Sequence, residues 1–280
     1  MRSWIAVIFT LLIPGAGAAT EPIPAPAYPW LMWAPARTIA DSFAPPSGFV
    51  RAPAVAGSFG LWLRHLPLAL EGTPVRFYDG SEKPDQSEVA AVIDIDVGSA
   101  DLQQCADAIV RLRAEYLFAH NDIGDLAFDF TSGDSYGFQS FAEGVTPAVA
   151  GAKVTWRTGK CQGLSHDSLR RWLDIVFRYA GTLSLSRELK SVPRLSDAVI
   201  GDVLVHGGTP GHAVLIVDLA VDPASGRKLA LLAQGFMPAQ SVHVLRNPLD
   251  PALSPWFALA DGQPIVMPEW MLRADELRRF

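Results

Sequence analysis

The chain has 280 residues, of which 49% are hydrophobic and 19% are charged, and it carries a net charge of -6 at pH 7. Its charges are scattered and mildly acidic, so we expect no nucleic-acid partner. The length fits one good-sized domain plus an arm. Two cysteines, Cys105 and Cys161, are too few for a disulfide scaffold.

The N-terminus has the organisation of a secretory signal peptide. Arg2 provides a positive charge, residues 4–13 are apolar, and residues 16–18 have the small-x-small pattern that signal peptidase recognises. The apolar run is shorter than the roughly 20 residues needed to cross a bilayer. We therefore expect residues 1–18 to be cleaved near Ala18, which leaves an exported protein, periplasmic or secreted, without a transmembrane segment. A retained N-terminal anchor is the alternative.

Residues 19–58 form a Pro/Ala-rich arm, and residues 59–280 form a single globular domain. Proline prevents regular helices and central strands, so the arm is expected to be extended. It carries Tyr28, Trp30 and Trp33, which we expect to dock on the domain because exposed tryptophan is costly.

The domain alternates short strands with two amphipathic helices. The first helix is predicted to start at Ser99 and to bury Cys105. The second is predicted from Ser165 or His166 to Tyr179, with a continuation towards Lys190 left open. Strands are predicted at residues 61–68, 75–78, 89–97, 126–130, 153–157, 203–205, 213–219 and 229–233, and a terminal helix at 268–280. The turn at residues 222–226 makes the last two strands a hairpin. The pattern indicates an α+β fold.

Several familiar catalytic motifs are missing: there is no Gly-x-Ser-x-Gly elbow, no glycine-rich phosphate loop and no His-Glu-x-x-His. His206 and His212 flank a Gly-Gly-Thr-Pro-Gly loop but lack a third ligand, so we expect no metal. No cofactor is expected either.

A cysteine early in a helix and a histidine at the start of a buried strand remain as candidate chemistry. A helix N-terminus and a nearby imidazole both favour the thiolate, which is the reactive form of Cys105. Antiparallel pairing around a turn centred near Pro223 sets His212 opposite Gln234, although a one-residue slip would turn Gln234 to the other face. Its side-chain amide is positioned to accept the imidazole N–H and to hold the tautomer.

Three segments resemble the CHAP and NlpC/P60 amidase-peptidases, which are papain-like enzymes that cut amide bonds in cell-wall peptides. The segments are residues 104–111, with Gln104 before the cysteine, 201–204 and 211–217, and Ala233-Gln234 follows where those families carry the residue that orients the histidine. The resemblance implies a papain-like core, a helix packed on an antiparallel sheet, with insertions. It also implies Cys105 as nucleophile, His212 as base and Gln234 as orienting residue. Gln104 is the candidate oxyanion donor.

Over nearly its whole length the chain is similar to a secreted bacterial family catalogued as domain of unknown function 4846. The similarity is carried by residues 57–60 with 63–64, and by 101–116, 180–185, 211–212, 237–240, 254–256 and 268–270. It implies no established activity.

We therefore predict an exported cysteine amidase or peptidase acting on cell-envelope, peptidoglycan-type peptides or glycans, with Trp156 and Tyr136 in substrate binding. The alternative is a non-catalytic envelope protein that uses a papain-like fold for binding. Cys105 as an inert core residue, or in a disulfide with Cys161, also stays open. The oligomeric state is left undetermined.

Overall fold

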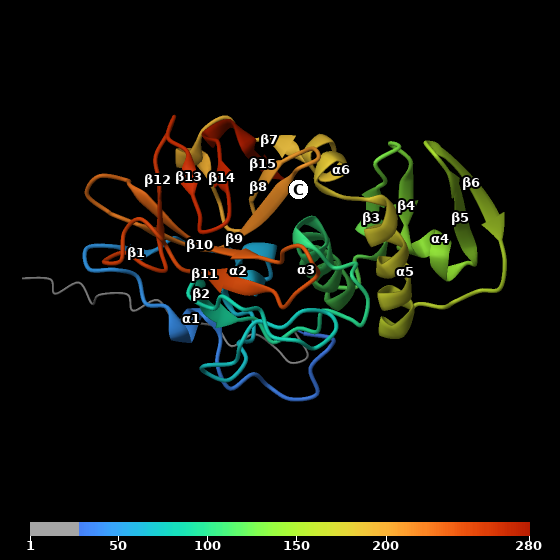
Figure 1. Cartoon of the computed structure of the whole chain (residues 1–280), viewed down its shortest axis with the longest axis horizontal. Helices are drawn as coiled ribbons and strands as arrows, with labels where there is room; N and C mark the ends of the chain where they lie inside the picture. Colours follow the sequence, from blue (N-terminus) through green and yellow to red (C-terminus); the bar gives the residue numbers. More distant parts are fainter. Residues whose placement is uncertain (1–27) are drawn as a thin grey trace, which may run out of the picture.

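The computed structural model describes residues 28–280, which combine a nine-stranded sheet with helices and three small hairpins (Figure 1). All strand pairs of the large sheet are antiparallel, and the order is β2-β11-β10-β9-β8-β15-β7, with β1 also on β9 and β12 on β10. Their bounds are β1 Val50–Arg51, β2 Val89–Val92, β7 Lys190–Ser191, β8 Val203–His206, β9 His212–Val221, β10 Lys228–Gln234, β11 His243–Leu245, β12 Phe257–Leu259 and β15 Leu277–Arg279. The predicted mixed α+β class is confirmed.

Both faces of the sheet are buried, and alternate residues of β9 enter different cores. Ala213 and Leu215 belong to the core that includes the long helix α3 (Cys105–Ala119), whereas Val214 and Ile216 belong to a core that includes Leu272 near the C-terminus. A strand covered on both sides reads as a continuous apolar run, which explains why this stretch gave so strong a strand signal.

Cys105 is the first helical residue of α3 and Gln104 is its cap, so the helix begins five residues later than predicted from a cap at Ser99. Gln104 is the N-cap, and the Asp107 side chain accepts a hydrogen bond from its backbone N–H over 3.1 Å. This local cap defines the start, while Ser99 lies in the preceding loop. The cysteine therefore lies at the helix N-terminus itself.

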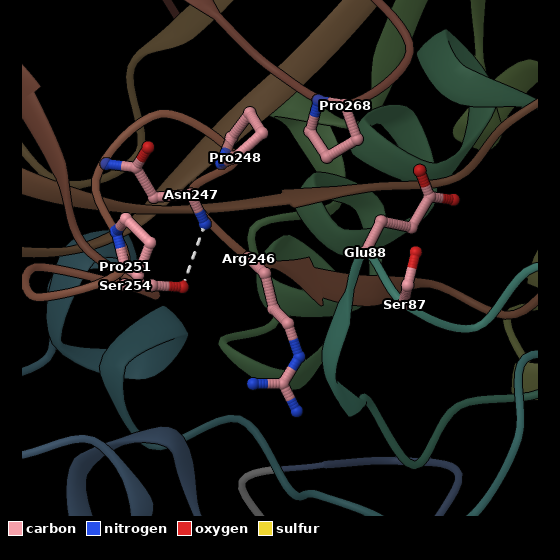
Figure 2. Close-up of a pocket in the computed structure, with 8 residues that line it drawn as sticks. All are labelled: Ser87, Glu88, Arg246, Asn247, Pro248, Pro251, Ser254 and Pro268. Carbon is pink, nitrogen blue, oxygen red and sulfur yellow. Dashed lines mark hydrogen bonds between the residues drawn. The ribbon is translucent and has the colours of Figure 1, made fainter.

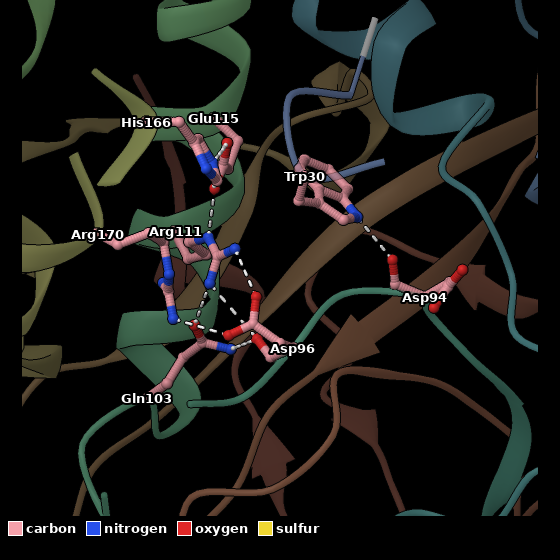
Figure 3. Close-up of polar contacts among 8 residues, drawn as sticks. All are labelled: Trp30, Asp94, Asp96, Gln103, Arg111, Glu115, His166 and Arg170. Atoms are coloured by element: carbon pink, nitrogen blue, oxygen red, sulfur yellow. Dashed lines mark hydrogen bonds and ion pairs between the residues drawn. The ribbon is translucent and has the colours of Figure 1, made fainter. Parts of the chain in front are cut away.

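A buried ion network attaches α3 to its surroundings (Figure 3). Arg111 and Glu115 are both fully buried on α3 and pair with each other over 2.6 Å. The network continues through Asp96, Gln103, and His166 and Arg170 of helix α5 (His166–Tyr179). Buried charges are tolerated when they are paired, and here the pairing fixes α3 against α5.

The second predicted helix, α5, begins as expected with Ser165 as its N-cap. It covers a side lobe that also contains β3 (Ala127–Asp129), β4 (Ser135–Gly137), α4 (Phe138–Ala142), β5 (Val145–Ala150) and β6 (Lys153–Thr158), and α6 (Thr182–Glu188) follows it as a separate helix. In Figure 1 the β5–β6 hairpin lies at the end of the molecule far from β12.

Three predicted elements are wrong. The strand expected at residues 75–78 is reduced to isolated bridges of Arg76 with Glu82 and of Phe77 with Gln240. Residues 61–68 were expected to form a strand, but Ser58 caps a short helix, α2 (Phe59–Arg64), whose apolar side chains pack on the sheet. The expected terminal helix is replaced by three short elements: β14 (Met271–Leu272), a 3₁₀ turn (Ala274–Glu276) and β15. Strand β14 pairs with β13 (Ile265–Val266). At the C-terminus strand pairing overrides local helix propensity, whereas at residues 59–64 the Ser58 cap starts a helix.

Part of the N-terminal arm docks as expected. Tyr28 is buried and donates from its hydroxyl to the backbone of Trp62, and Trp30 donates to the backbone of Asp94, whereas Trp33 is 81% exposed. The arm also contributes α1 (Ile39–Ser42) and β1. The predicted signal peptide lies outside the described residues, and none of the helices between residues 28 and 280 is long and apolar enough to span a membrane.

Candidate functional site

Cys105 lies where the N-terminus of α3 meets the first residues of β9. Its side chain is buried, and the backbone N–H of Ala213 points to the sulfur and favours its ionised form. Ala213 directly follows His212, so the structure brings the predicted cysteine to the segment that carries the predicted histidine.

Burial dominates the ionisation of this thiol. It raises the pKa of Cys105 to about 11, and the nearby Asp107 adds to the rise, while the N–H groups of Ala213 and of the helix start oppose it. We had expected the helix N-terminus and the imidazole to favour a thiolate. That expectation is wrong for this structure, because the loss of hydration outweighs both effects.

Gln234 lies within hydrogen-bonding distance of His212. The imidazole Nε2 and the amide Oε1 are 2.8 Å apart, and both side chains are buried. The register differs from the predicted one: Ala233 pairs with Leu215, which sets Gln234 beside Val214 rather than opposite His212. A shift of two residues keeps a side chain on the same face, so the contact survives the change in register.

His212 is enclosed by aromatic rings and is kept neutral. Its ring centroid lies 5.1 Å from that of Phe236 and 5.4 Å from that of Trp270. Burial lowers the pKa of His212, against the raising effects of its hydrogen bond to Gln234 and of the charge on Glu269. The resting pair is therefore a neutral thiol and a neutral imidazole.

Cys105 and His212 approach β9 from different sides. α3 packs on the sheet face of Ala213, whereas His212 shares the strand alternation of Val214, on the opposite face. Among residues 28–280, no hydrogen bond joins the sulfur to the imidazole. Cys105 on α3 and His212 on β9 are therefore not connected for proton transfer in the resting state.

A chain of polar groups missed from the sequence continues from Gln234. Its Nε2 donates to Glu269 Oε2 over 3.0 Å and lies 3.5 Å from His243 Nε2, and Lys83 lies 2.8 Å from Glu269 Oε1. Lys83 also pairs with Glu88. The segment Pro268-Glu269-Trp270 stood out in the family resemblance, but we had assigned it to a helix and not to the site.

Gln104, the candidate oxyanion donor, is held next to the cysteine. Its Nε2 donates to Asp101 Oδ1 over 3.0 Å, and the same oxygen accepts the backbone N–H of Ala239. Its role as a donor to substrate stays a prediction.

The predicted substrate-binding pair lies elsewhere. Tyr136 is 1% exposed and donates its hydroxyl to the backbone of Val145, so it is a core residue of the side lobe. Trp156 packs on it with ring centroids 5.2 Å apart and is 42% exposed. In this structure the lobe's own aromatic side chains cover Tyr136, and its role as a substrate contact stays a prediction.

Both cysteines are free, with Cys105 buried and Cys161 exposed, so the structure does not form the disulfide alternative. Nδ1 of His206 lies 2.7 Å from Glu276 Oε1, whereas His212 bonds to Gln234, so the two histidines have different partners. In the part of the chain that the structure describes, no group of three or more His, Cys, Asp or Glu side chains is arranged to hold a metal ion.

A cavity of about 390 Å³ opens beside Glu88, the last residue of the polar chain that runs from Gln234 through Glu269 and Lys83 (Figure 2). It is lined by Ser87, Glu88, Arg246, Asn247, Pro248, Pro251, Ser254 and Pro268. It contains none of the predicted catalytic residues, but its Glu88 pairs with Lys83, which pairs with Glu269, a partner of Gln234.

Comparisons with known proteins identify the family and nothing beyond it. Neither the curated proteins nor the solved structures contain a match to this chain. The family model described as domain of unknown function 4846 matches residues 39–279, which include all four predicted catalytic positions. The chain therefore belongs to the family of domain of unknown function 4846.

Proposed function

We propose that this protein is an exported cysteine hydrolase with a papain-like core that cleaves an amide or peptide bond in cell-envelope peptides. The observation that carries the proposal is the arrangement around β9: Cys105 begins α3 with its sulfur at the Ala213 N–H, and the preceding His212 is bonded to Gln234. A nucleophile, a base and a residue that orients the base are the parts that such a reaction requires.

The neutral resting pair suits general-base activation. Because the two side chains lie on different faces of β9 at rest, the imidazole must first turn towards the sulfur. As the sulfur then attacks the carbonyl carbon, its proton passes to His212, and the imidazolium gives that proton to the leaving amine. Water hydrolyses the resulting thioester, with His212 again taking and returning a proton. Gln104 and the backbone N–H of Cys105 are the proposed donors to the oxyanion.

The second candidate is a non-catalytic envelope protein that binds a peptide, glycan or partner. The observation that favours a binding role is the burial of both proposed catalytic side chains, because Cys105 is 5% and His212 is 1% exposed. A substrate carbonyl reaches the sulfur only if the covering side chains move, and a binding protein requires no such opening.

Digestion of purified cell-wall material separates the two candidates. We expect the wild type to release peptides or free amines detectable by mass spectrometry, and Cys105→Ser and His212→Ala to lose nearly all release while keeping thermal midpoints close to wild type. Cys161→Ser is the matched control and should act as wild type, because this exposed thiol lies outside the site. Equal release by wild type and Cys105→Ser, or none by wild type, would leave only the binding role.

A further inference from the structure

We propose that Glu269 and His243 are positioning residues, which fix the amide of Gln234 so that His212 holds its proton on Nε2 and keeps Nδ1 free as the base. The direction of each hydrogen bond follows from two groups that can only accept, the backbone carbonyl of Ser241 and the carboxylate of Glu269. The tautomer is independent of the proposed function, whereas its catalytic use rests on it.

The first fixed point is the backbone carbonyl of Ser241. His243 Nδ1 lies 3.0 Å from this oxygen, and a carbonyl only accepts, so His243 carries its proton on Nδ1. Burial lowers the pKa of His243 to about 4, which keeps the ring neutral near pH 7. Its Nε2 is therefore an acceptor.

The second fixed point is Glu269. Lys83 engages its Oε1, and its Oε2 faces the amide of Gln234. An ionised carboxylate also only accepts.

Two acceptors on one side determine the orientation of the Gln234 amide. Its NH₂ group has two hydrogens, one for Glu269 at 3.0 Å and one facing the His243 ring at 3.5 Å. The reversed amide would set its oxygen against a carboxylate and a nitrogen lone pair, and a buried mismatch of this kind is strongly unfavourable. The oxygen therefore faces His212.

An amide oxygen facing His212 Nε2 at 2.8 Å requires a proton on that nitrogen. The neutral ring then has its lone pair on Nδ1. Within residues 28–280, Nδ1 has no hydrogen-bond partner, so its lone pair is free to accept a proton.

The tautomer can be measured without any substrate, by ¹⁵N NMR of histidine-labelled protein. We expect His212 in the wild type to be protonated on Nε2 and not on Nδ1. In the double variant Glu269→Ala/His243→Phe, which frees the amide to rotate, a second population protonated on Nδ1 should appear. Glu269→Asp should keep the wild-type tautomer, because a carboxylate still offers one oxygen to Lys83 and one to Gln234.

The matched control is Glu276→Gln, which changes the partner of His206 and not that of His212, and should leave the His212 signals unchanged. A wild-type His212 protonated on Nδ1, or a folded double variant with the tautomer unaltered, would overturn the proposal. If the double variant does not fold, the wild-type and Glu269→Asp spectra still decide. In hydrolysis assays we expect kcat/KM of the double variant to fall roughly 10²-fold or more. If the wild type shows the predicted tautomer but hydrolyses nothing, the proposed function is refuted and the tautomer assignment stands.

Discussion

The sulfur of Cys105 lies at the backbone N–H of Ala213, one residue along the chain from His212. This contact joins the first residue of α3 to the start of β9, although the cysteine and the imidazole approach the strand from different faces. It connects the residue that we propose as nucleophile to the central sheet. The predictions below concern this contact and the residues around it.

The first prediction concerns the mature N-terminus. Because residues 16–18 have the small-x-small pattern after a short apolar run, we expect the exported protein to begin at Ala19 or within two residues of it. Mass spectrometry of protein recovered from the envelope or medium measures this directly. An intact Met1 on that protein would show that the segment is not removed.

The second prediction concerns the thiols. Cys105 and Cys161 are both free, and a disulfide would consume the proposed nucleophile. We expect two thiols per chain when the protein is titrated in denaturant without reductant. A peptide crosslinked through both cysteines in the digest, with no titratable thiol, would contradict the prediction.

The third prediction concerns the buried ion network. Arg111→Met removes the charge that faces Glu115 and Asp96, and Glu115 remains buried. Breaking a buried pair from one side typically costs about 3–5 kcal/mol, so we expect a loss of that order in the free energy of unfolding.

Urea denaturation measures this loss. Arg194→Met is its control: Arg194 pairs with Asp197 on the surface, where such pairs contribute about 0–1 kcal/mol. A loss for Arg111→Met no larger than that of the control would show that the network does not stabilise the fold.

The fourth prediction concerns pH. Burial raises the pKa of Asp107 to about 8, whereas an unfolded aspartate titrates near 3.9. Between these values the folded state keeps a proton that the unfolded state releases, so this group makes the protein less stable as the pH rises from about 4 to 8.

Asp107→Asn removes this dependence, and its side-chain oxygen can still accept the N–H of Gln104. We therefore expect the variant to gain stability relative to wild type as the pH rises, as measured by urea midpoints at several pH values. Parallel curves for the two proteins would show that Asp107 is already ionised in the folded state.

The elements near the site were largely predictable from the sequence, and the reason is physical. β8, β9 and β10 are apolar runs separated by clear turns, and α5 has a strong cap and one apolar face. Such signals are local. The predicted start of α3 at Ser99 is wrong because the helix is capped at Gln104, where Asp107 accepts the backbone N–H, and glutamine is not among the residues that mark a helix start in a sequence.

The polar chain behind His212 could not be predicted in the same way. Lys83, His243 and Glu269 lie far apart in the sequence and meet only when the C-terminal segment folds over the sheet. The ionisation of Cys105 was also beyond reach, because it depends on how completely the folded core excludes water.

The most direct test of the central claim is the rate at which iodoacetamide alkylates Cys105 in the native protein near pH 7, compared between wild type and His212→Ala. Peptide mass spectrometry follows Cys105 and Cys161 together, so the exposed Cys161 is an internal reference for each sample. If His212 takes the thiol proton, the wild-type Cys105 should react about 10²-fold faster than in the variant, with equal rates at Cys161. Equal rates at Cys105, or no labelling of wild-type Cys105 up to alkaline pH, would contradict the account.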